Sequence, residues 1–212
     1  GYEQASVRFT PDGGLEVRVG IQCHGQGLET TLAQVAHEIL GLNIESIKII
    51  HGDTELSPYS TGTWGSRAMV MSGGAVATAC EKLCERIQLI GAHLLQTGLE
   101  DVRIEGGYVK APSGKISLID VARTWYRRPQ DLPADVDRQG LEVTAGYKPR
   151  RDDGTFSYAA HAAVVAIDPN FGNVEIIKYV VVEDGGVLIN PMIVDGQILG
   201  GAAQGIGTAL YE

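Results

Sequence analysis

A glycine-rich loop between a predicted strand and a predicted helix is the first stretch whose residues could bind a ligand. Residues 15–21 alternate apolar and polar side chains as a strand does, and residues 28–40 repeat apolar side chains every three or four positions as a helix does. The loop His24–Gly27 joins them. Glycines allow close backbone approach, and the first N–H groups of a helix are free donors at the positive end of its dipole. The loop can therefore bind an anion such as phosphate, although similar connections in many proteins bind nothing.

A second helix start has the same character. The stretch 55–65 is long, irregular and rich in Ser, Thr, Gly and Pro, and Gly65, Ser66 and Arg67 then open a helix that we predict to reach Leu94. We expect Ser66 to be the N-cap of this helix, because its hydroxyl can accept a bond from a free N–H group. Arg67 adds a permanent charge and a planar set of donors, so these residue types again favour phosphate.

The three cysteines do not indicate a disulfide framework. Cys80 and Cys84 lie one helical turn apart, where two thiolates could bind a metal, but no His or further Cys nearby completes a ligand set. We expect this pair on a buried helix face, because free Cys commonly packs as a small hydrophobe. Cys23 differs from the pair, since it lies in the first glycine loop.

The elements that position these loops are a hairpin, two helices and a further strand. Residues 5–21 predict the hairpin, because apolar side chains alternate on both sides of a Pro-Asp-Gly turn. Gly41 is expected to end the first helix, and residues 44–50 predict the next strand. Residues 101–140 predict a small excursion with a short hairpin and a short helix, in which we find no chemistry.

The C-terminal part predicts a long hairpin and a helix rich in glycine. The two β-rich runs of the hairpin are residues 159–167 and 173–182. Asn190 is the expected N-cap of a helix that begins at Pro191. Five glycines in this helix each cost roughly 1 kcal/mol relative to alanine. We therefore expect another element or a flat ligand to approach its backbone closely.

Together these elements predict an α+β (α/β-like) fold with mixed sheets and packed helices. We expect two parts, a first α/β subdomain over residues 1–140 and a second subdomain over residues 141–212 that is incomplete at its C-terminus. The length of 212 residues allows a substantial core, and the 44% hydrophobic and 20% charged residues are typical of globular proteins.

Charge and hydropathy exclude two classes of partner. The net charge of −9 without a dominant basic cluster argues against nucleic-acid binding. No apolar run reaches the roughly 18 to 20 residues of a membrane span. Because the first residues also lack the pattern of a secretion leader, we expect a cytoplasmic location.

Several short motifs follow one another along nearly the whole chain. Each motif is weak alone, whereas the ordered set is specific. The matching stretches are His24–Gly27 with Thr30 and Gln34, Gly52–Thr54, Gly62–Arg67, Asp184–Gly186, Asn190–Pro191 and Gly196–Gly207. In this order they resemble the molybdenum-cofactor-binding (large) subunit of the xanthine dehydrogenase and aldehyde oxidase family, the molybdenum hydroxylases.

The resemblance implies which residues would bind the cofactor. Seven residues of the two glycine loops would wrap the pterin and the phosphates of a molybdopterin dinucleotide, and one residue of the last helix would reach the pterin near the metal. These residues are His24, Gly25, Gln26 and Gly27, then Gly65, Ser66 and Arg67, and finally Gln204. Family members with a Gly-Ser-Arg segment commonly use the cytosine dinucleotide form of the cofactor, so the resemblance implies this form here. Ala68 stands where the family often has a hydroxyl residue, which implies the loss of one hydrogen bond to the cofactor.

The resemblance also implies an oxidoreductase that hydroxylates an aldehyde, an N-heterocycle or a similar small substrate with oxygen from water. Electrons would leave through iron–sulfur centres and FAD on partner subunits or domains. The family's catalytic glutamate lies beyond Glu212, so we expect no catalytic residue and no metal ligand in this chain. The chain would then be a piece of a molybdenum subunit that is inactive alone and is completed by the remainder of that subunit.

Two alternatives stay open from the sequence. The chain could be a non-catalytic assembly module of the same fold that binds no cofactor, or a nucleotide-binding domain unrelated to molybdenum. Under the cofactor hypothesis, we expect Gln26→Ala and Arg67→Ala to weaken cofactor retention without unfolding the domain, because both residues are predicted in loops.

Overall fold

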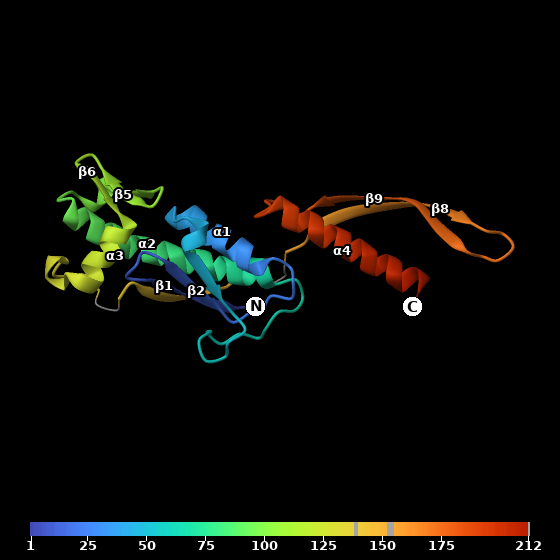
Figure 1. The fold of residues 1–212 in the computed structure, drawn as a ribbon, viewed down its shortest axis with the longest axis horizontal. Helices are drawn as coiled ribbons and strands as arrows, with labels where there is room; N and C mark the ends of the chain where they lie inside the picture. Colours follow the sequence, from blue (N-terminus) through green and yellow to red (C-terminus); the bar gives the residue numbers. More distant parts are fainter. Residues whose placement is uncertain (138–139, 152–154, 212) are drawn as a thin grey trace. The chain divides into compact units, whose positions relative to one another are not determined.

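The computed structural model describes residues 1–137, 140–151 and 155–211. Contacts divide the chain into two compact units, Gly1–Asp152 and Asp153–Glu212 (Figure 1), and each unit is described by itself. The first unit extends past the boundary that we expected after residue 140, because strand β7 (Glu142–Tyr147) pairs with the first strand of the chain, β1 (Glu3–Phe9). A strand taken into a sheet from a distant part of the chain gives no local signal of the unit to which it belongs.

The first unit mixes strands and helices. In chain order, its described elements are β1 (Glu3–Phe9), β2 (Leu15–Val19), α1 (Leu28–Leu40), η1 (Ile44–Ser46), β3 (Ile47–Ile50), η2 (Ala68–Gly73), α2 (Gly74–Leu94), η3 (Leu99–Asp101), β4 (Arg103–Glu105), β5 (Tyr108–Ala111), β6 (Gly114–Ser117), α3 (Leu118–Arg127), η4 (Pro129–Asp131) and β7 (Glu142–Tyr147). The segment η2 is π-helical, and the other η segments are 3-10 turns.

The main sheet has the strand order β3-β2-β1-β7. The predicted opening hairpin is confirmed, since β1 pairs with β2 antiparallel and Val7 lies opposite Val17. β3 pairs with β2 in parallel, and α1 is the crossover between these two strands. The first glycine loop therefore occupies the turn that follows β2 in a strand-helix-strand unit.

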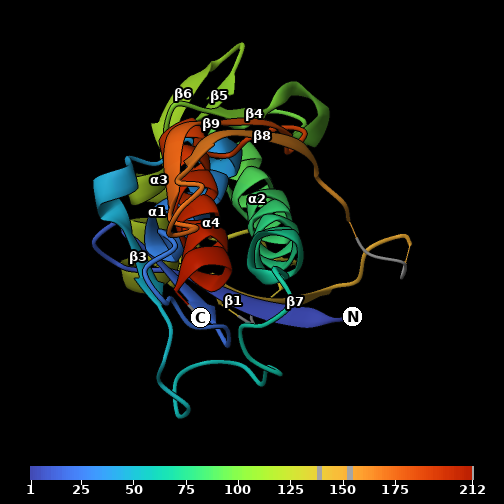
Figure 2. The ribbon, with the colours of Figure 1, turned by 90° about the vertical axis from the view of Figure 1, so that its right-hand side faces the viewer.

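Helices α1 and α2 lie side by side over one face of this sheet (Figures 1 and 2). The alternating apolar side chains of the hairpin are buried, as the sequence pattern predicts: Ala5, Val7, Phe9, Leu15, Val17 and Val19. The polar positions between them carry ion pairs, in which Glu16 Oε2 lies 2.6 Å from Arg8 and 3.0 Å from Arg18. This division into an apolar and a charged face fixes the register of the hairpin, because a slip of one residue would exchange the faces.

The two helix starts near the glycine loops differ in how well they were predicted. α1 runs from Leu28 to Leu40, and the left-handed φ of 65° at its C-cap residue Gly41 confirms the predicted stop. The prediction that Ser66 caps the second helix is wrong. Ser66 has a left-handed φ of 55°, whereas an N-cap residue normally has extended dihedrals, and the helical segment begins at Ala68 as a π-helical turn before α2.

The predicted excursion forms a small antiparallel sheet, β4-β5-β6, followed by α3. Ser117 caps α3 by accepting a bond from the N–H group of Asp120. Val109 of β5 packs against α2 at Gly91, where an added methyl group would lie 2.7 Å from it. The predicted hairpin and short helix are thus confirmed.

The second unit contains β8 (Tyr158–Ile167), β9 (Val174–Asp184) and α4 (Pro191–Leu210). The two strands form the predicted antiparallel hairpin. Asn190 caps α4 as predicted, because its side chain accepts a bond of 3.1 Å from the N–H group of Ile193. Apart from chain neighbours and the adjacent backbone of α4 itself, no described residue lies within 4 Å of a methyl group added at the five glycines of α4, so the close approach that we expected there remains a prediction.

The predicted buried position of the helical cysteines is confirmed for Cys80, which is fully buried on α2, while Cys84 is half-buried. Burial raises the pKa of the Cys80 thiol well above its usual range and that of Cys84 to about 11. Both residues are therefore neutral thiols at physiological pH.

Candidate functional site

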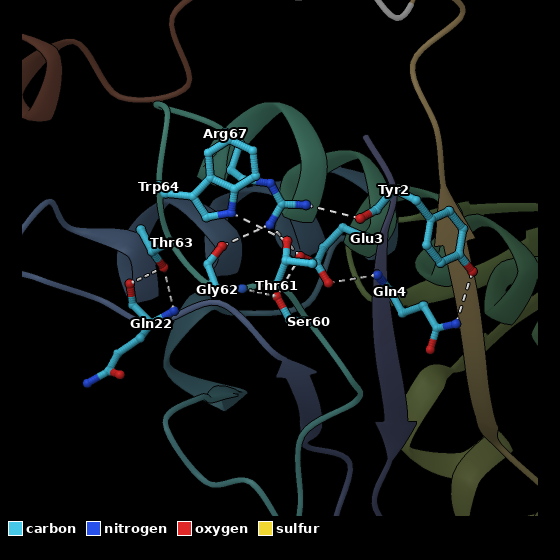
Figure 3. Close-up of polar contacts among 10 residues, drawn as sticks. All are labelled: Tyr2, Glu3, Gln4, Gln22, Ser60, Thr61, Gly62, Thr63, Trp64 and Arg67. Atoms are coloured by element: carbon cyan, nitrogen blue, oxygen red, sulfur yellow. Dashed lines mark hydrogen bonds and ion pairs between the residues drawn. The ribbon is translucent and has the colours of Figure 1, made fainter.

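The two glycine loops are bonded to each other at one end of the first unit. The Thr63 hydroxyl accepts a bond of 2.7 Å from the N–H group of Gln22 and donates one of 2.8 Å to its carbonyl (Figure 3). Gln22 opens the first loop, and Thr63 lies in the second. A single side chain thus satisfies both backbone groups of one residue and fixes the spacing of the two loops.

The first loop approaches α1 through left-handed glycines. Gly25 has a φ of 103° and Gly27 one of 74°, values that residues with a side chain rarely adopt. Gly27 is the N-cap residue of α1 and supplies no capping side chain. The Gln26 side chain folds back within the loop, where its Oε1 accepts a bond from the His24 N–H group and its Nε2 donates to the Gln22 carbonyl at 3.4 Å. The predicted residues His24 to Gly27 thus form one ordered turn at an uncapped helix start.

The second loop has the same features. Gly62, Gly65 and Ser66 all have left-handed φ values, of 88°, 58° and 55°. The N-cap position of η2 is Arg67, which makes no capping bond with its side chain. Because η2 also contacts α1, two helix starts without side-chain caps lie at the same end of the unit. Neither N-cap side chain occupies the first N–H groups, and in α1 the Glu29 N–H group bonds its own carboxylate.

The Arg67 guanidinium is turned into the protein. Its NH1 group lies 2.8 Å from Glu3 Oε2 and 2.9 Å from the Gly62 carbonyl, and its NH2 group donates to the Tyr2 carbonyl at 3.0 Å (Figure 3). The guanidinium carbon also lies 5.7 Å from the centre of the Trp64 ring. The side chains of Arg67 and Glu3 are only 10% and 1% exposed. The predicted phosphate donor therefore already has protein partners.

Glu3 is the residue of this region that the sequence analysis missed. A signal was present, because Glu3 is in register with the buried positions Ala5 and Val7 of a predicted strand. A carboxylate on a core face needs a cation or several donors, so its position alone points to a partner elsewhere in the chain.

A fixed negative charge lies at the start of α1. Hydrogen bonds from the Cys23 thiol and from His51, whose Nε2 lies 2.9 Å from Oε1, hold the pKa of Glu29 down to about 2. Glu29 is in the first turn of the helix, where the dipole also favours an anion. An external anion at this helix start therefore has to use the backbone donors of the loop beside this carboxylate.

The remaining predicted site residue, Gln204, lies on α4 in the second unit and is exposed. Its role near the pterin stays a prediction. Among the described residues, no cluster of three or more His, Cys, Asp and Glu side chains could hold a metal ion. None of the described helices is long and apolar enough to cross a membrane.

The donor set of the two loops suits a ligand with phosphate groups. Uncapped helix starts bind phosphate through backbone N–H groups, and glycines at the turns leave room for the ligand. At Gly25, Gly62 and Gly65, a methyl group would meet no other described atom within 4 Å, so the space beside these turns is open. The residues present thus fit a ligand with phosphate groups.

Comparison with known proteins gives the family. All residues from 1 to 212 match the family model described as a molybdopterin cofactor-binding domain. The chain is 38% identical to the nicotine 6-hydroxylase large subunit of Paenarthrobacter nicotinovorans and 33% identical to the carbon monoxide dehydrogenase large chain of Hydrogenophaga pseudoflava, and each alignment covers 100% of this chain and 26% of the relative.

The fold is similar to that of quinoline 2-oxidoreductase from Pseudomonas putida 86, with a TM-score of 0.89 and 36% identity over 97% of this chain and 26% of that chain. The chain thus spans about a quarter of the length of the relatives that it matches. The chain belongs to the molybdopterin cofactor-binding domain family of the molybdenum hydroxylase large subunits.

Proposed function

We propose that the two glycine loops hold the phosphates and the pterin of a molybdopterin dinucleotide. The observation that carries this proposal is the pair of uncapped helix starts, η2 and α1, whose loops are joined by the bonds between Thr63 and Gln22. Backbone N–H groups of both loops would bind the phosphates, since the Arg67 guanidinium is already bonded within the protein.

The bound cofactor would supply the redox-active molybdenum centre. The residues of this chain would bind and orient it: His24, Gly25, Gln26 and Gly27 in the first loop, Gly65, Ser66 and Arg67 in the second, and Gln204 on α4. The cytosine dinucleotide is the proposed form. We assign no catalytic residue within residues 1–212.

We further propose that the complete protein is an oxidoreductase that hydroxylates a small aldehyde, N-heterocycle or similar compound with oxygen from water. Relatives are named as large subunits, and one is subunit gamma of the 6-hydroxypseudooxynicotine dehydrogenase complex. These names support partner subunits. In our proposal, partner subunits or domains carry iron–sulfur centres and FAD, and the protein is cytoplasmic.

The test is to express the full-length subunit with its partners and to measure molybdenum by mass spectrometry and acid-released nucleotide by chromatography. We expect stoichiometric amounts of molybdenum and cytidine nucleotide. Another nucleotide with molybdenum would contradict only the cytosine form. A folded complex without either component would support the alternative, a non-catalytic assembly module. Micromolar binding of common nucleotides by a molybdenum-free complex would instead favour a general nucleotide-binding domain.

A further inference from the structure

The buried carboxylate of Glu3 belongs to a closed ring of hydrogen bonds that includes residues of the second loop. Its Oε2 accepts a bond of 2.7 Å from the Ser60 hydroxyl and one of 2.8 Å from Arg67, while its Oε1 accepts a bond of 3.1 Å from the Gln4 N–H group (Figure 3). Ser60 and Arg67 are far from Glu3 in sequence. The carboxylate thus ties the edge of the loop to strand β1.

Both partners of Glu3 bind the same residue of the loop, Gly62, through the two peptide units that flank its Cα atom. The Ser60 hydroxyl accepts a bond of 3.0 Å from the Gly62 N–H group, and Arg67 donates one of 2.9 Å to the Gly62 carbonyl. Glu3, Ser60, Gly62 and Arg67 therefore form a closed ring, which we call the Glu3 ring. Gly62 has a left-handed φ of 88°, so the ring holds the chain in a conformation that is uncommon outside such turns.

The direction of the next donor follows from this ring. Because the peptide unit is planar and trans, the Thr63 N–H group points away from the side on which the Gly62 carbonyl meets Arg67. The Thr63 side chain in turn holds both backbone groups of Gln22. The Glu3 ring therefore fixes the orientation of the second loop and, through Thr63, its distance from the first.

We propose that Glu3 is a positioning residue of the cofactor site, and that Arg67 serves the site through the Glu3 ring rather than as a phosphate ligand. The inference rests on the proposed function. A buried ion pair usually adds little net stability compared with apolar residues of the same volume, whereas this pair, together with Ser60, holds both backbone groups of Gly62. The guanidinium donates twice through NH1 and once through NH2 to protein atoms.

The two possible roles of Arg67 predict opposite results for Glu3→Gln. If the guanidinium bound phosphate directly, release of Arg67 from Glu3 would leave cofactor binding intact or tighter. If the Glu3 ring positions the loop, Glu3→Gln and Arg67→Met weaken binding alike. The double variant then loses no more than the worse single variant, because both changes break the same ring.

The experiment uses the full-length subunit with its partners. For the wild type, Glu3→Gln, Arg67→Met and the double variant, it measures the release rate of molybdenum and nucleotide from folded complex after dilution at low and high salt. It also measures amide hydrogen exchange in residues 22–27 and 62–67. We expect each single variant to speed release on the order of 10- to 100-fold, to speed exchange in both loops, and to leave the salt dependence of release unchanged.

Two controls separate positioning from general stability. Ile90→Ala creates a cavity at the far end of α2, where Ile90 is fully buried, and is expected to lower the melting temperature without changing release. Ser60→Ala removes the neutral side chain of the Glu3 ring and keeps the ion pair between Glu3 and Arg67. This variant can therefore be measured if the charge variants fail to fold. It is expected to speed both release and loop exchange.

Three results would overturn the inference. Wild-type release from Glu3→Gln with fast release from Arg67→Met would identify Arg67 as a direct ligand. Unchanged release in all ring variants would leave the ring a structural feature only. If the wild-type complex carries no cofactor, the proposed function fails separately, and unchanged loop exchange in the variants would then overturn the positioning role as well.

Discussion

At the residue scale, Gln26 is the half-buried loop side chain best placed to separate binding from folding. Within the described part of the chain, its amide bonds backbone groups of its own loop, at His24 and Gln22. We expect Gln26→Ala in the full-length complex to lower molybdenum and nucleotide content roughly tenfold, with a stability change within about 0.5 kcal/mol, as for surface substitutions. Gln130→Ala, at an exposed position in η4, is the matched control and should retain full content. A variant of Gln26 that fails to fold would assign this side chain a structural role instead.

Arg67→Ala is expected to destabilise the protein, whereas the predicted loop position of Arg67 implied little effect on folding. Because Glu3 is 1% exposed, removal of its cation leaves an unpaired buried carboxylate, which costs about 3–5 kcal/mol. Urea denaturation should therefore show a large loss of unfolding free energy. Glu3→Gln/Arg67→Ala should recover part of it, since no unpaired charge remains. Equal stability of wild type and Arg67→Ala would contradict the buried pair.

Glu29 predicts a specific acid sensitivity. Its pKa is lowered from 4.5 to about 2 by bonds from Cys23 and then from His51, so its contribution to stability is complete above pH 4.5 and is lost as the pH falls toward 2. The Glu29 side chain is 51% exposed, which limits this contribution to under about 1 kcal/mol. Glu29→Gln should flatten the stability curve between pH 4.5 and 2. Identical curves for the two proteins would contradict the assigned bonds.

At the scale of elements, two features require glycine at the C-terminal end of α1: the left-handed backbone of Gly41 and its close contact with a neighbouring turn. Gly41 has a φ of 65°, and a methyl group there would lie 2.8 Å from the backbone nitrogen of Gly106 in the β4–β5 turn. Gly106 has a similar φ of 58° and open space around it, so Gly106→Ala is a matched control. We expect Gly106→Ala to cost about 1–2 kcal/mol and Gly41→Ala more, by chemical denaturation. Equal costs would show that the turn moves away freely.

The elements show which parts of the fold are readable from sequence. The opening hairpin, α1 with its stop at Gly41, and the cap of α4 at Asn190 were predictable because neighbouring residues determine them. Strand β7 was not assigned to the first unit, since its pairing with β1 is a distant contact. Ser66 was wrongly expected to be a cap, because the Glu3 ring and the left-handed glycines set the backbone there rather than local capping.

The loops that form the candidate site were predictable in the same partial way. Residue types and spacing identified both loops, since glycines and helix starts are local features. The contacts that join the loops were not readable, because Thr63 and Gln22 are 41 residues apart. The same holds for the bond between Arg67 and Glu3, which are 64 residues apart. In the sequence, Glu3 is recognisable as a charged residue in register with the apolar face of a strand.

At the scale of the whole molecule, the two units differ in how far they bury their own side chains. The first unit holds the buried core, whereas the hairpin of the second exposes apolar residues such as Ile177, at 58%, and Val182, at 67%. A two-stranded hairpin is marginal in water by itself. Because the chain spans 26% of the relatives' length, the proposed activity belongs to the complete subunit, and the loops of the first unit are its best-defined contribution.

The most direct test is an experimental structure of the full-length subunit in complex with its partners, with the cofactor phosphates located relative to the two loops. We predict hydrogen bonds from backbone N–H groups around Gly25–Leu28 and Ser66–Met69 to the phosphates or the pterin, with Arg67 still bonded to Glu3. A cofactor bound away from both loops, or an Arg67 guanidinium turned out onto a phosphate, would contradict this account.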